Sequence, residues 1–259
     1  MPTQPTSQSP DFHNARVLVT GASRGIGADI VQAFAVAGAT LILSGRERAP
    51  LEAMSAQLNS AYGTHSAVVT ADLSEPGGAA SLADDAARAF DGIDVLINNA
   101  GISYPESVDE LDPEHFEEVM QVNLHAPALL AARVGSDMAE HGGGSIVTIA
   151  SAAALRPLPQ HYAYCISKAG LIMATKVLAL ELGGRGVRAN SVCPTVVLTD
   201  MGHKVWGDPI KSTPMLGRIP VGRFAEPNEV SRTALWLASP ESGMINGIDV
   251  PVDGGYLVS

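Results

Sequence analysis

Short β-branched apolar runs alternate with longer alanine-rich stretches along almost the whole chain. The longer stretches carry apolar residues at helical spacing, and each is long enough to form a helix. Parallel strands need a crossover between them, and this alternation supplies one each time. We therefore expect an α/β fold with one doubly wound parallel sheet and helices on both faces. The expected strands are 17–19, 41–43, 67–69, 95–97, 146–149, 187–192 and 249–252, and the expected helices are 26–37, 51–58, 77–90, 113–133, 163–182 and 228–237.

The chain of 259 residues is long enough for one large α/β domain, and nothing in the sequence divides it. We expect this single domain over residues 15–259, after a disordered tail over residues 1–14. The tail is polar and lacks the basic start and apolar stretch of a signal peptide. Residues 194–220 are rich in glycine and proline and show no clear period. Such a segment inside a domain is typical of a lid, so we expect a substrate lid at about 195–220.

Charge and cysteine content narrow the choice of partners. The chain has 27 acidic and 16 basic residues, a formal net charge of -11, so its field disfavours nucleic acid and anionic membrane surfaces. Its two cysteines, Cys165 and Cys193, lie far apart without metal-ligand spacing, which favours reduced thiols in a cytoplasmic protein. The most apolar helical stretch carries Lys176 and is shorter than a membrane span. We expect no metal, no nucleic acid and no membrane partner.

The stretch TGASRGIG allows two interpretations. Its G-A-S-R-G fits the turn that presents a nucleophilic serine in hydrolases, here Ser23, and HGGG at 141–144 resembles the oxyanion loop of lipases. In those enzymes the loop precedes the nucleophile, whereas here it follows Ser23 by more than a hundred residues. The alternative is a glycine-rich turn after the first strand that holds a dinucleotide phosphate against helix amides. The order of the motifs favours this second interpretation, a Rossmann-type binding site.

Four further residues carry the expected chemistry. Tyr164 and Lys168 lie four apart and therefore on one face of the helix expected over 163–182. Ser151 directly follows the fifth strand, and Asn123 lies in the helix before it. With TGASRGIG and NNAG, these residues make the chain resemble the classical short-chain dehydrogenase/reductase family over nearly its whole length. The segment PTVVLTDMG is similar to the L-xylulose (dicarbonyl) reductase branch of that family.

The resemblance implies an oxidoreductase in which Tyr164 exchanges the proton. A phenol has a pKa near ~10, and lowering it by ~2 units needs about 2.7 kcal/mol of preferential stabilisation of the phenolate. We expect Lys168 and the positive nicotinamide ring to supply it. In reduction, Tyr164 then donates a proton to the carbonyl oxygen as hydride arrives, while the Ser151 hydroxyl holds that oxygen. Asn123, by the same resemblance, orders its helix and a water of the proton relay.

The residues after the second strand indicate NADP(H). Sheets that bind NAD usually place Asp or Glu there for the ribose hydroxyls, whereas this strand is followed by Arg46, which can bind a 2'-phosphate together with Arg24. Glu47 keeps NAD(H) open as the alternative, because a small backbone shift brings its carboxylate to the ribose. By resemblance, the cofactor-binding residues are Gly21, Ser23, Arg24, Gly25, Ile26, Gly27, Arg46, Asp72, Leu73, Asn99, Ala100, Gly101, Pro194, Val197 and Thr199.

The resemblance implies a ketose, a sugar acid or a small dicarbonyl as substrate, with His161 and Trp206 near it. The structural alternative makes His161 a helix-start residue and Trp206 an anchor of the lid. Within the family, a 3-oxoacyl thioester reductase stays open as the alternative. Outside enzymes, the alternative is a non-catalytic NADP-sensing protein, which the intact tetrad of Asn123, Ser151, Tyr164 and Lys168 disfavours. The resemblance also implies a homotetramer.

Overall fold

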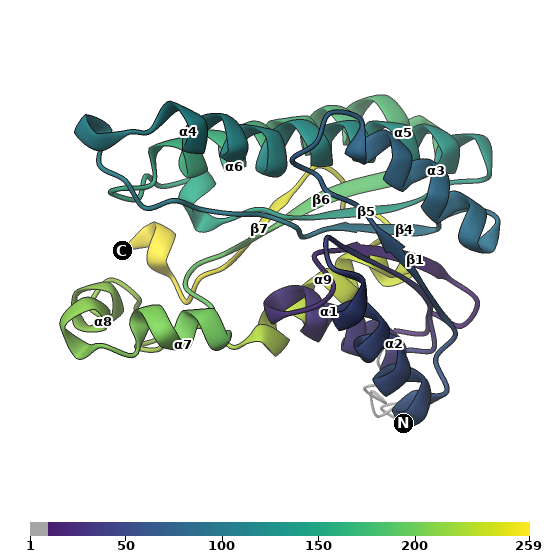
Figure 1. Ribbon diagram of the computed structural model, residues 1–259, viewed down its shortest axis with the longest axis horizontal. Helices are drawn as coiled ribbons and strands as arrows, with labels where there is room; N and C mark the ends of the chain where they lie inside the picture. The colour runs from purple at the N-terminus through teal and green to yellow at the C-terminus, as the bar shows by residue number, and fades with distance from the viewer. Residues whose placement is uncertain (1–9) are drawn as a thin grey trace, which may run out of the picture.

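The computed structural model describes residues 10–259 of the protein, apart from the side chains at 201, 205 and 211, and holds one sheet between two layers of helices (Figure 1). Seven parallel strands lie in the order β3-β2-β1-β4-β5-β6-β7. The strands are β1 (Arg16–Thr20), β2 (Thr40–Gly45), β3 (Ser66–Thr70), β4 (Val95–Asn98), β5 (Gly144–Ile149), β6 (Val187–Pro194) and β7 (Asp249–Val252). The predicted fold class and all seven predicted strands are confirmed. The order of the strands reverses between β1 and β4, which is where such sheets bind their ligands.

The two helical layers use opposite sides of the same strands. Val17 and Val19 of β1 pack into the core cluster below the sheet in Figure 1, and Leu18 packs into the cluster above it, because successive strand residues point to opposite faces. The lower layer is formed by α1 (Gly25–Val36), α2 (Arg48–Tyr62) and α9 (Pro227–Ala238). The upper layer is formed by α3 (Gly78–Phe90), α4 (Pro113–Met120), α5 (Ala126–Glu140) and α6 (Tyr162–Leu182). Both sheet faces are therefore covered, as the strand composition predicts.

The helix predicted over 113–133 is wrong as a single element. The structure divides it into α4 and α5, joined by a π-helical turn over Gln121–His125, and α5 continues to Glu140. The beginning of α4 is capped by Asp112, whose carboxylate accepts a hydrogen bond from the amide of Glu114 at 2.8 Å. A π-turn rotates the residues within it relative to a regular helix and is often found at functional sites. Asn123 lies in this turn.

The lid predicted at about 195–220 is more regular than expected. It contains α7 (Asp200–Trp206) and α8 (Pro209–Leu216). Thr199 and Asp208 cap the two helices, since their side chains accept hydrogen bonds from the amides of Gly202 and Ile210 at 3.1 and 2.9 Å. Each helix spans only about two turns, too short for a helical period to show in the sequence.

The predicted boundary between tail and domain lies too late. Phe12 is buried, its ring meets that of Phe34 edge-on at 4.8 Å, and its amide donates to the carbonyl of Ala37 at 2.9 Å. The folded domain therefore includes residues that were assigned to the disordered tail over 1–14. Residues 1–9 of that prediction lie outside the described residues.

Helix α6 with the 3-10 turn that follows it, Tyr162–Arg185, is the one stretch in the described part of the chain that is long and apolar enough, by length and composition alone, to cross a membrane. The apolar stretch is therefore longer than expected from the sequence, and the expectation that it is too short to span a membrane is wrong. In the structure α6 packs against β6, β5 and α5, with Leu171 and Leu182 buried. Its apolar composition is that of a helix that lines the core.

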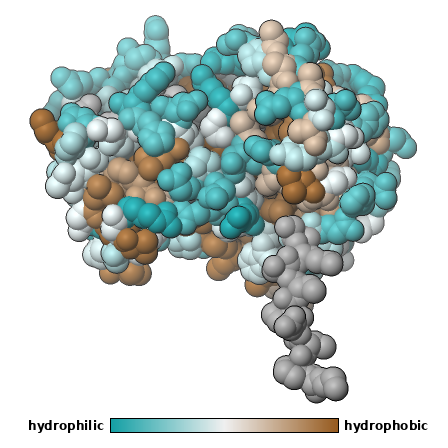
Figure 2. Space-filling model, turned by 90° about the horizontal axis from the view of Figure 1, so that it is seen from below, coloured by the Kyte–Doolittle hydropathy of each residue, from teal (hydrophilic) through white to brown (hydrophobic). Residues whose placement is uncertain are grey.

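The face seen from below carries hydrophilic side chains with apolar groups between them (Figure 2). Some of the apolar groups gather toward the end of the molecule at which Figure 1 places α7 and α8. Ile210, in the first turn of α8, is 84% exposed, and Val221, shortly after the lid, is 61% exposed. Helix α8 of the lid thus carries exposed apolar surface.

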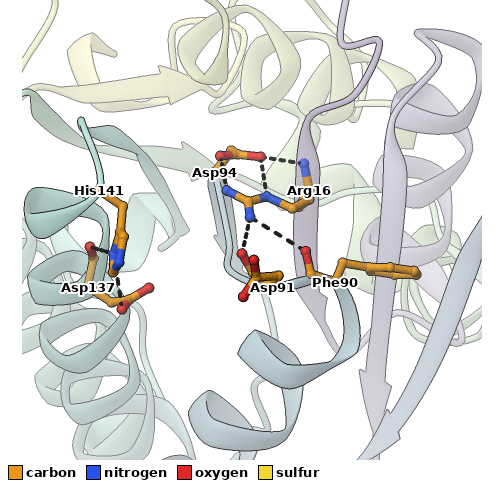
Figure 3. Close-up of polar contacts among 6 residues, drawn as sticks. All are labelled: Arg16, Phe90, Asp91, Asp94, Asp137 and His141. Carbon is orange, nitrogen blue, oxygen red and sulfur yellow. Dashed lines mark hydrogen bonds and ion pairs between the residues drawn. The ribbon is translucent and has the colours of Figure 1, made fainter.

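An ion pair joins β1 to β4 at the edge of the sheet where both strands begin (Figure 3). The guanidinium of Arg16 donates to both carboxylate oxygens of Asp94, at 2.8 and 2.7 Å, and the Arg16 amide donates to the same group at 2.8 Å. The guanidinium also reaches the carbonyl oxygens of Phe90 and Asp91. Burial alone would raise the pKa of Asp94, but these hydrogen bonds from Arg16 hold it below its ordinary value of 3.8. The pair therefore fixes the two strands that flank the reversal of strand order.

We expect Asp94→Asn to lower the free energy of unfolding by about 1 kcal/mol at neutral pH, after allowance for the partial exposure of the pair. Because the folded pKa of Asp94 is depressed, this contribution is present above its unfolded pKa near 3.8 and is lost as the pH falls through the folded value. Urea denaturation of both proteins at a series of pH values measures it. A difference that persists undiminished at acid pH would contradict the assignment. Asp85→Asn, which removes the exposed partner of Arg88 on α3, is the control.

Candidate active site

A cavity of about 130 Å³ lies where the carboxyl ends of the central strands meet. Its walls come from the start of α1, the loops after β4, β5 and β6, and the first two turns of α6. The lining residues are Ile26, Asn99, Ile149, Ala150, Ser151, Tyr164, Lys168, Pro194 and Thr195. The structure thus brings together six of the predicted site residues from distant parts of the chain, at the predicted edge of the sheet.

The glycine-rich turn has the geometry of a phosphate cradle. Gly21 and Gly25 have positive φ angles of 65° and 58°, a backbone conformation that L side chains rarely adopt. A Cβ atom at Gly27 would overlap the carbonyl oxygen of Gly21, so the turn can close only with glycine at this position. The turn leads into the first residues of α1, whose free amides form a ready site for an anion.

The positions of Ser23 and of the HGGG motif in the sheet exclude the hydrolase interpretation. Ser23 lies in the turn after β1, at the carboxyl edge of the sheet. The HGGG motif at 141–144 runs into the beginning of β5, at the opposite edge. The two motifs therefore cannot form one site, and Ser23 is a residue of the glycine-rich turn.

Thr20, the first residue of the glycine motif, ties that motif to NNAG. Its hydroxyl oxygen accepts hydrogen bonds from the amides of Asn99 and Ala100 at 3.0 and 3.1 Å. The Asn99 side chain returns a bond from Nδ2 to the carbonyl of Thr20 at 2.9 Å. Thr20 is missing from the predicted site residues, although its place at the end of the first strand is a signal that could have identified it. Its hydroxyl holds the loops after β1 and β4 at a fixed separation.

Asn123 holds the loop after β4 in place through hydrogen bonds. It is fully buried, and its amide side chain pairs with Ile102 by accepting from the Ile102 nitrogen and donating to the Ile102 oxygen, both at 2.8 Å. Its Nδ2 also lies 3.3 Å from the Ser167 hydroxyl on α6. A Cβ atom at Gly101 would lie 3.2 Å from Asn123 Oδ1 and 3.4 Å from Lys168 Nζ, so glycine allows the loop to pass close to both. Asn123 therefore joins this loop to α6; the water that the resemblance places beside it stays a prediction.

Lys168 is a buried amine without a carboxylate partner among residues 10–259 of the chain. Its side chain is 3% exposed, and Nζ donates a hydrogen bond to the carbonyl of Ile149 at 2.9 Å. Nζ also lies 5.8 Å from the centre of the Tyr164 ring. Burial lowers the pKa of Lys168 from 10.5 to about 8. The Ile149 carbonyl, which sequence reasoning missed, thus fixes the position of this charge.

The protein alone keeps Tyr164 protonated. Burial raises the pKa of the Tyr164 phenol above 10.0, and the neighbouring Ser151 hydroxyl acts in the opposite direction. The Ser151 oxygen also accepts a hydrogen bond from the Ala153 amide at 3.1 Å, which orients it at the end of β5. Lys168 and the nicotinamide ring were expected to lower the pKa of Tyr164 together. The residues of the protein alone do not produce this lowering.

The expected adenosine side of the site carries two exposed arginines. Arg24 precedes α1 and Arg46 follows β2, and neither forms an ion pair with any described residue. Asp72 lies near enough to Arg46 for that charge to contribute to its lowered pKa, after the larger effect of hydrogen bonds from Ser74. Glu47 is the residue before α2 and makes no side-chain cap. Both arginines are therefore free to bind an anion.

The remaining predicted residues follow β3 or lie between the end of β6 and the beginning of α7. Thr199 caps α7, and a Cβ atom at Gly25 would lie 3.4 Å from its methyl group, so the lid begins against the glycine-rich turn. Val197 forms an isolated parallel bridge with Ala225. Pro194 ends β6 and lines the cavity, and Leu73 is buried after β3. Pro194 is thus the one of these four residues that lines the cavity.

The two predicted substrate residues have different surroundings. His161 directly precedes α6, its ring meets that of Tyr164 edge-on at 6.1 Å, and its Nδ1 lies 2.8 Å from the Pro159 carbonyl. Trp206 lies in α7, 5.7 Å from the Phe224 ring, and packs with the lid cluster that includes Ala152. His161 is therefore adjacent to the Tyr164 ring, whereas Trp206 has the packing of a lid anchor.

Comparison with known proteins agrees with this geometry. The family model described as enoyl-(acyl carrier protein) reductase matches residues 21–257. A D-threitol dehydrogenase of Mycolicibacterium smegmatis is 43% identical over 93% of this chain and 92% of its own length. An L-xylulose reductase of Caenorhabditis elegans is 41% identical over 95% of this chain and 97% of its own.

A solved structure from Beutenbergia cavernae, named as a candidate NAD(P)-dependent gluconate 5-dehydrogenase with NADP bound at low occupancy, superposes with a TM-score of 0.92. The two sequences are 34% identical, and the match covers 97% of this chain and 100% of the other chain. A relative from Listeria innocua that is 33% identical, over 93% of each chain, is named an NAD-dependent glycerol dehydrogenase. The names of these two proteins both specify a nicotinamide cofactor, but the first names NAD(P) and the second names NAD.

We expect Lys168→Met to raise the free energy of unfolding of the cofactor-free protein by about 1–2 kcal/mol at neutral pH. A pKa lowered from 10.5 to about 8 means that the buried charge costs roughly 3 kcal/mol, which loss of the bond to Ile149 partly offsets. The cost is fully present below the folded pKa and is lost as the pH rises from about 8 to 10.5, so the gain should shrink over that range.

Urea denaturation across that pH range measures the effect of Lys168→Met. A variant that is less stable than the wild type at neutral pH, or a gain that does not change with pH, would show that Lys168 is not held as a buried charge. Lys176→Met is the control on the same helix. Lys176 is 41% exposed and pairs with Asp249 at 2.6 Å, so its loss should give no gain in stability.

Proposed function

The chain belongs to the short-chain dehydrogenase/reductase family, and from this premise we propose that it transfers hydride between NADP(H) and a carbonyl or secondary alcohol of a ketose, sugar acid or polyol. The observation that carries the proposal is the convergence of the Tyr164 phenol, the Ser151 hydroxyl and the buried Lys168 amine on one cavity at the reversal of strand order. Enzymes of this kind need a proton donor, an oxygen-binding group and a nearby positive charge.

The residues present fit a nicotinamide dinucleotide. The glycine-rich turn with positive φ angles at Gly21 and Gly25 offers backbone amides to a pyrophosphate. The 130 Å³ cavity, lined by Ile26 and Pro194 on its apolar sides, leads from that turn to Tyr164. When bound, the cofactor supplies or accepts the hydride. The chain supplies the binding, the orientation and the proton.

Ser151, Tyr164 and Lys168 each have a separate role in reduction. The Ser151 hydroxyl donates a hydrogen bond to the carbonyl oxygen of the substrate and fixes its position. Tyr164 Oη gives its proton to the same oxygen as negative charge develops there. Lys168 Nζ, held by the Ile149 carbonyl, provides a positive charge beside the resulting phenolate. In oxidation the same groups act in reverse.

NADP(H) is the cofactor that we propose, because Arg24 and Arg46 are exposed and have no acidic partner in the described residues. Two guanidinium groups provide paired donors for a 2'-phosphate. The NADP in the similar Beutenbergia cavernae structure supports this choice. NAD(H) is the alternative, supported by Glu47 beside Arg46 and by the NAD-dependent relative.

Sugars and polyols are the substrate class that we propose, on the names of the threitol, xylulose and gluconate enzymes that this chain is similar to. His161, whose ring lies beside that of Tyr164, is the residue that we propose to contact the hydroxyl groups of such a substrate. A 3-oxoacyl thioester reductase is the alternative within the family. On the resemblance we further propose a cytoplasmic homotetramer, which light scattering and fractionation of the source cells would test.

The experiment that tests the function follows NADPH absorbance with L-xylulose, diacetyl, 5-ketogluconate and an acetoacetyl thioester, and NADP+ reduction with D-threitol. Turnover of a sugar or polyol supports the proposal. Turnover of the thioester alone would assign the chain to the acyl alternative. If the whole panel gave no turnover, the proposed substrate class would be wrong and the sensor alternative would gain weight.

We expect Tyr164→Phe to lower kcat by about 10²–10⁴-fold, because it removes the proton donor and leaves the ring in place. NADPH binding, measured by fluorescence titration, should change less than about twofold, since the hydroxyl is not needed to hold the dinucleotide. If the variant kept the wild-type kcat, Tyr164 would not be the proton donor. Tyr162→Phe, two residues earlier and exposed, is the matched control.

We expect Arg46→Ala to raise the KM for NADPH by about tenfold, because a charge-assisted hydrogen bond is worth roughly 1.5–3 kcal/mol in binding. The KM for NADH should change less than about twofold, since NADH lacks the 2'-phosphate. Arg48→Ala is the control, because Arg48 forms an exposed pair with Glu52 at 3.6 Å. Equal weakening of both cofactors, or a wild type that prefers NADH, would instead favour Glu47 as the ribose ligand.

A further inference from the structure

The loop between β4 and α4 forms a polar cluster with α4 that lies outside the cavity. The Tyr104 hydroxyl donates to the carboxylate of Glu118 at 2.7 Å, and its ring stacks on His115 with centroids 4.0 Å apart. His115 Nδ1 pairs with one carboxylate oxygen of Glu106. The other oxygen of Glu106 accepts from the Asp112 amide at 3.3 Å. Both oxygens of Glu106 are therefore engaged, and its side chain is 18% exposed.

The backbone of Glu106 contacts the segment that begins α6. Its amide donates to the carbonyl of Gln160 at 2.8 Å, and it forms an isolated parallel bridge with His161. Gln160 has a φ of 61°, a left-handed conformation that is uncommon for a residue other than glycine. Strained backbone of this kind persists only where its surroundings hold it, and the bond from Glu106 is one such contact.

This segment is directly connected to the reacting group. The carbonyl of His161 accepts from the Cys165 amide at 2.8 Å in the first turn of α6, and Tyr164 lies in that turn. The His161 ring meets the Tyr164 ring edge-on at 6.1 Å. Helix α4 packs along α6 (Figure 1), and a second contact joins the rings of Phe116 and Tyr162 at 6.5 Å. A shift of the Glu106 backbone would therefore be passed to His161 first and to Tyr164 next.

We propose that Glu106 is a positioning residue of the active site: its carboxylate, held by His115 and by the Asp112 amide, fixes the backbone bond to Gln160 that sets His161 beside Tyr164. The clamp consists of Glu106, His115 and the Glu106–Gln160 backbone bond. Its kinetic consequence rests on the proposed function, whereas the clamp itself is a property of the fold. Loss of the clamp weakens substrate binding through His161 and leaves the glycine-rich turn and its bonds to Asn99 intact.

The clamp is sensitive to pH because His115 is titratable. The hydrogen bond to Glu106 raises the pKa of His115 above 6.5, partial burial opposes it, and the carboxylates of Asp112 and Glu118 add to the rise. Tyr104 stacks on the imidazole and feels the charge of Arg46, and α6 presents His161 and Tyr162 to this region. Because the folded pKa is raised, the ion pair is present at lower pH and is lost as the pH rises through that value. Substrate KM should therefore rise on the alkaline side.

The first test measures the clamp without any substrate. Glu106→Gln keeps the size and hydrogen-bonding capacity of the side chain and removes its charge. Amide hydrogen exchange of the full-length protein should be about fivefold to tenfold faster at position 106 and at Cys165, as expected when a contact of about 1 kcal/mol is lost. Unchanged exchange at both amides would overturn the proposal. Should Glu106→Gln fail to fold, His115→Gln removes the same pair from the more exposed side and decides the question.

The second test measures kinetics with L-xylulose and, in oxidation, with D-threitol. Both variants should show substrate KM raised about fivefold, kcat and the KM for NADPH changed less than about twofold, and no dependence of substrate KM on pH across the titration of His115. A parallel fall in kcat and in NADPH binding would overturn the proposal, because it indicates general loss of structure. Asp137→Asn, which disrupts an acid–histidine pair at the opposite edge of the sheet (Figure 3), should change nothing. If the wild type turned over none of the sugars, sugar acids and polyols tested for the proposed function, that function would fail, and hydrogen exchange alone would decide on the clamp.

Discussion

The hydrogen bond from Lys168 to the Ile149 carbonyl is the interaction on which the site depends. It holds an amine inside the protein, at the end of β5, with no carboxylate beside it in the described residues. A charge buried in this way lowers stability unless something negative is brought to it. A phenolate at Tyr164 would be such a partner. The fold therefore accepts a destabilising charge at the place where the proposed chemistry creates a negative one.

The surrounding contacts fix the position of Lys168 relative to the glycine-rich turn. Thr20 ties the glycine-rich turn to the loop after β4, and Asn123 ties the same loop to α6. The first tie joins the loops after β1 and β4, the two strands at the reversal of strand order, and the second joins the loop after β4 to the helix that follows β5, the next strand of the sheet. The Arg16–Asp94 pair fixes β1 and β4 at the opposite edge (Figure 3). The site is thus a consequence of how the central strands are held at both ends.

Much of this arrangement can be predicted from the sequence, because the sheet follows from hydrophobic periodicity and the cavity residues from ordered motifs at strand ends. The π-turn at Asn123 cannot be seen in this way, since the apolar spacing continues through it. Helices α7 and α8 are too short to show a period, although their caps at Thr199 and Asp208 are visible in the sequence. Contacts such as Glu106 with Gln160, and the raised pKa of Tyr164, depend on tertiary burial and appear only in the structure.

The protein alone keeps Tyr164 protonated, and we propose that positive charge brought by the oxidised cofactor, added to Lys168, makes the phenol exchangeable near neutral pH. The most direct measurement is the ultraviolet difference titration of tyrosine ionisation in the wild type minus Tyr164→Phe, with and without NADP+. We expect the pKa of the phenol to lie above 10.0 in the free protein and to be lowered when NADP+ is bound. The same pKa in both states, or a phenol already ionised at neutral pH without the cofactor, would contradict it.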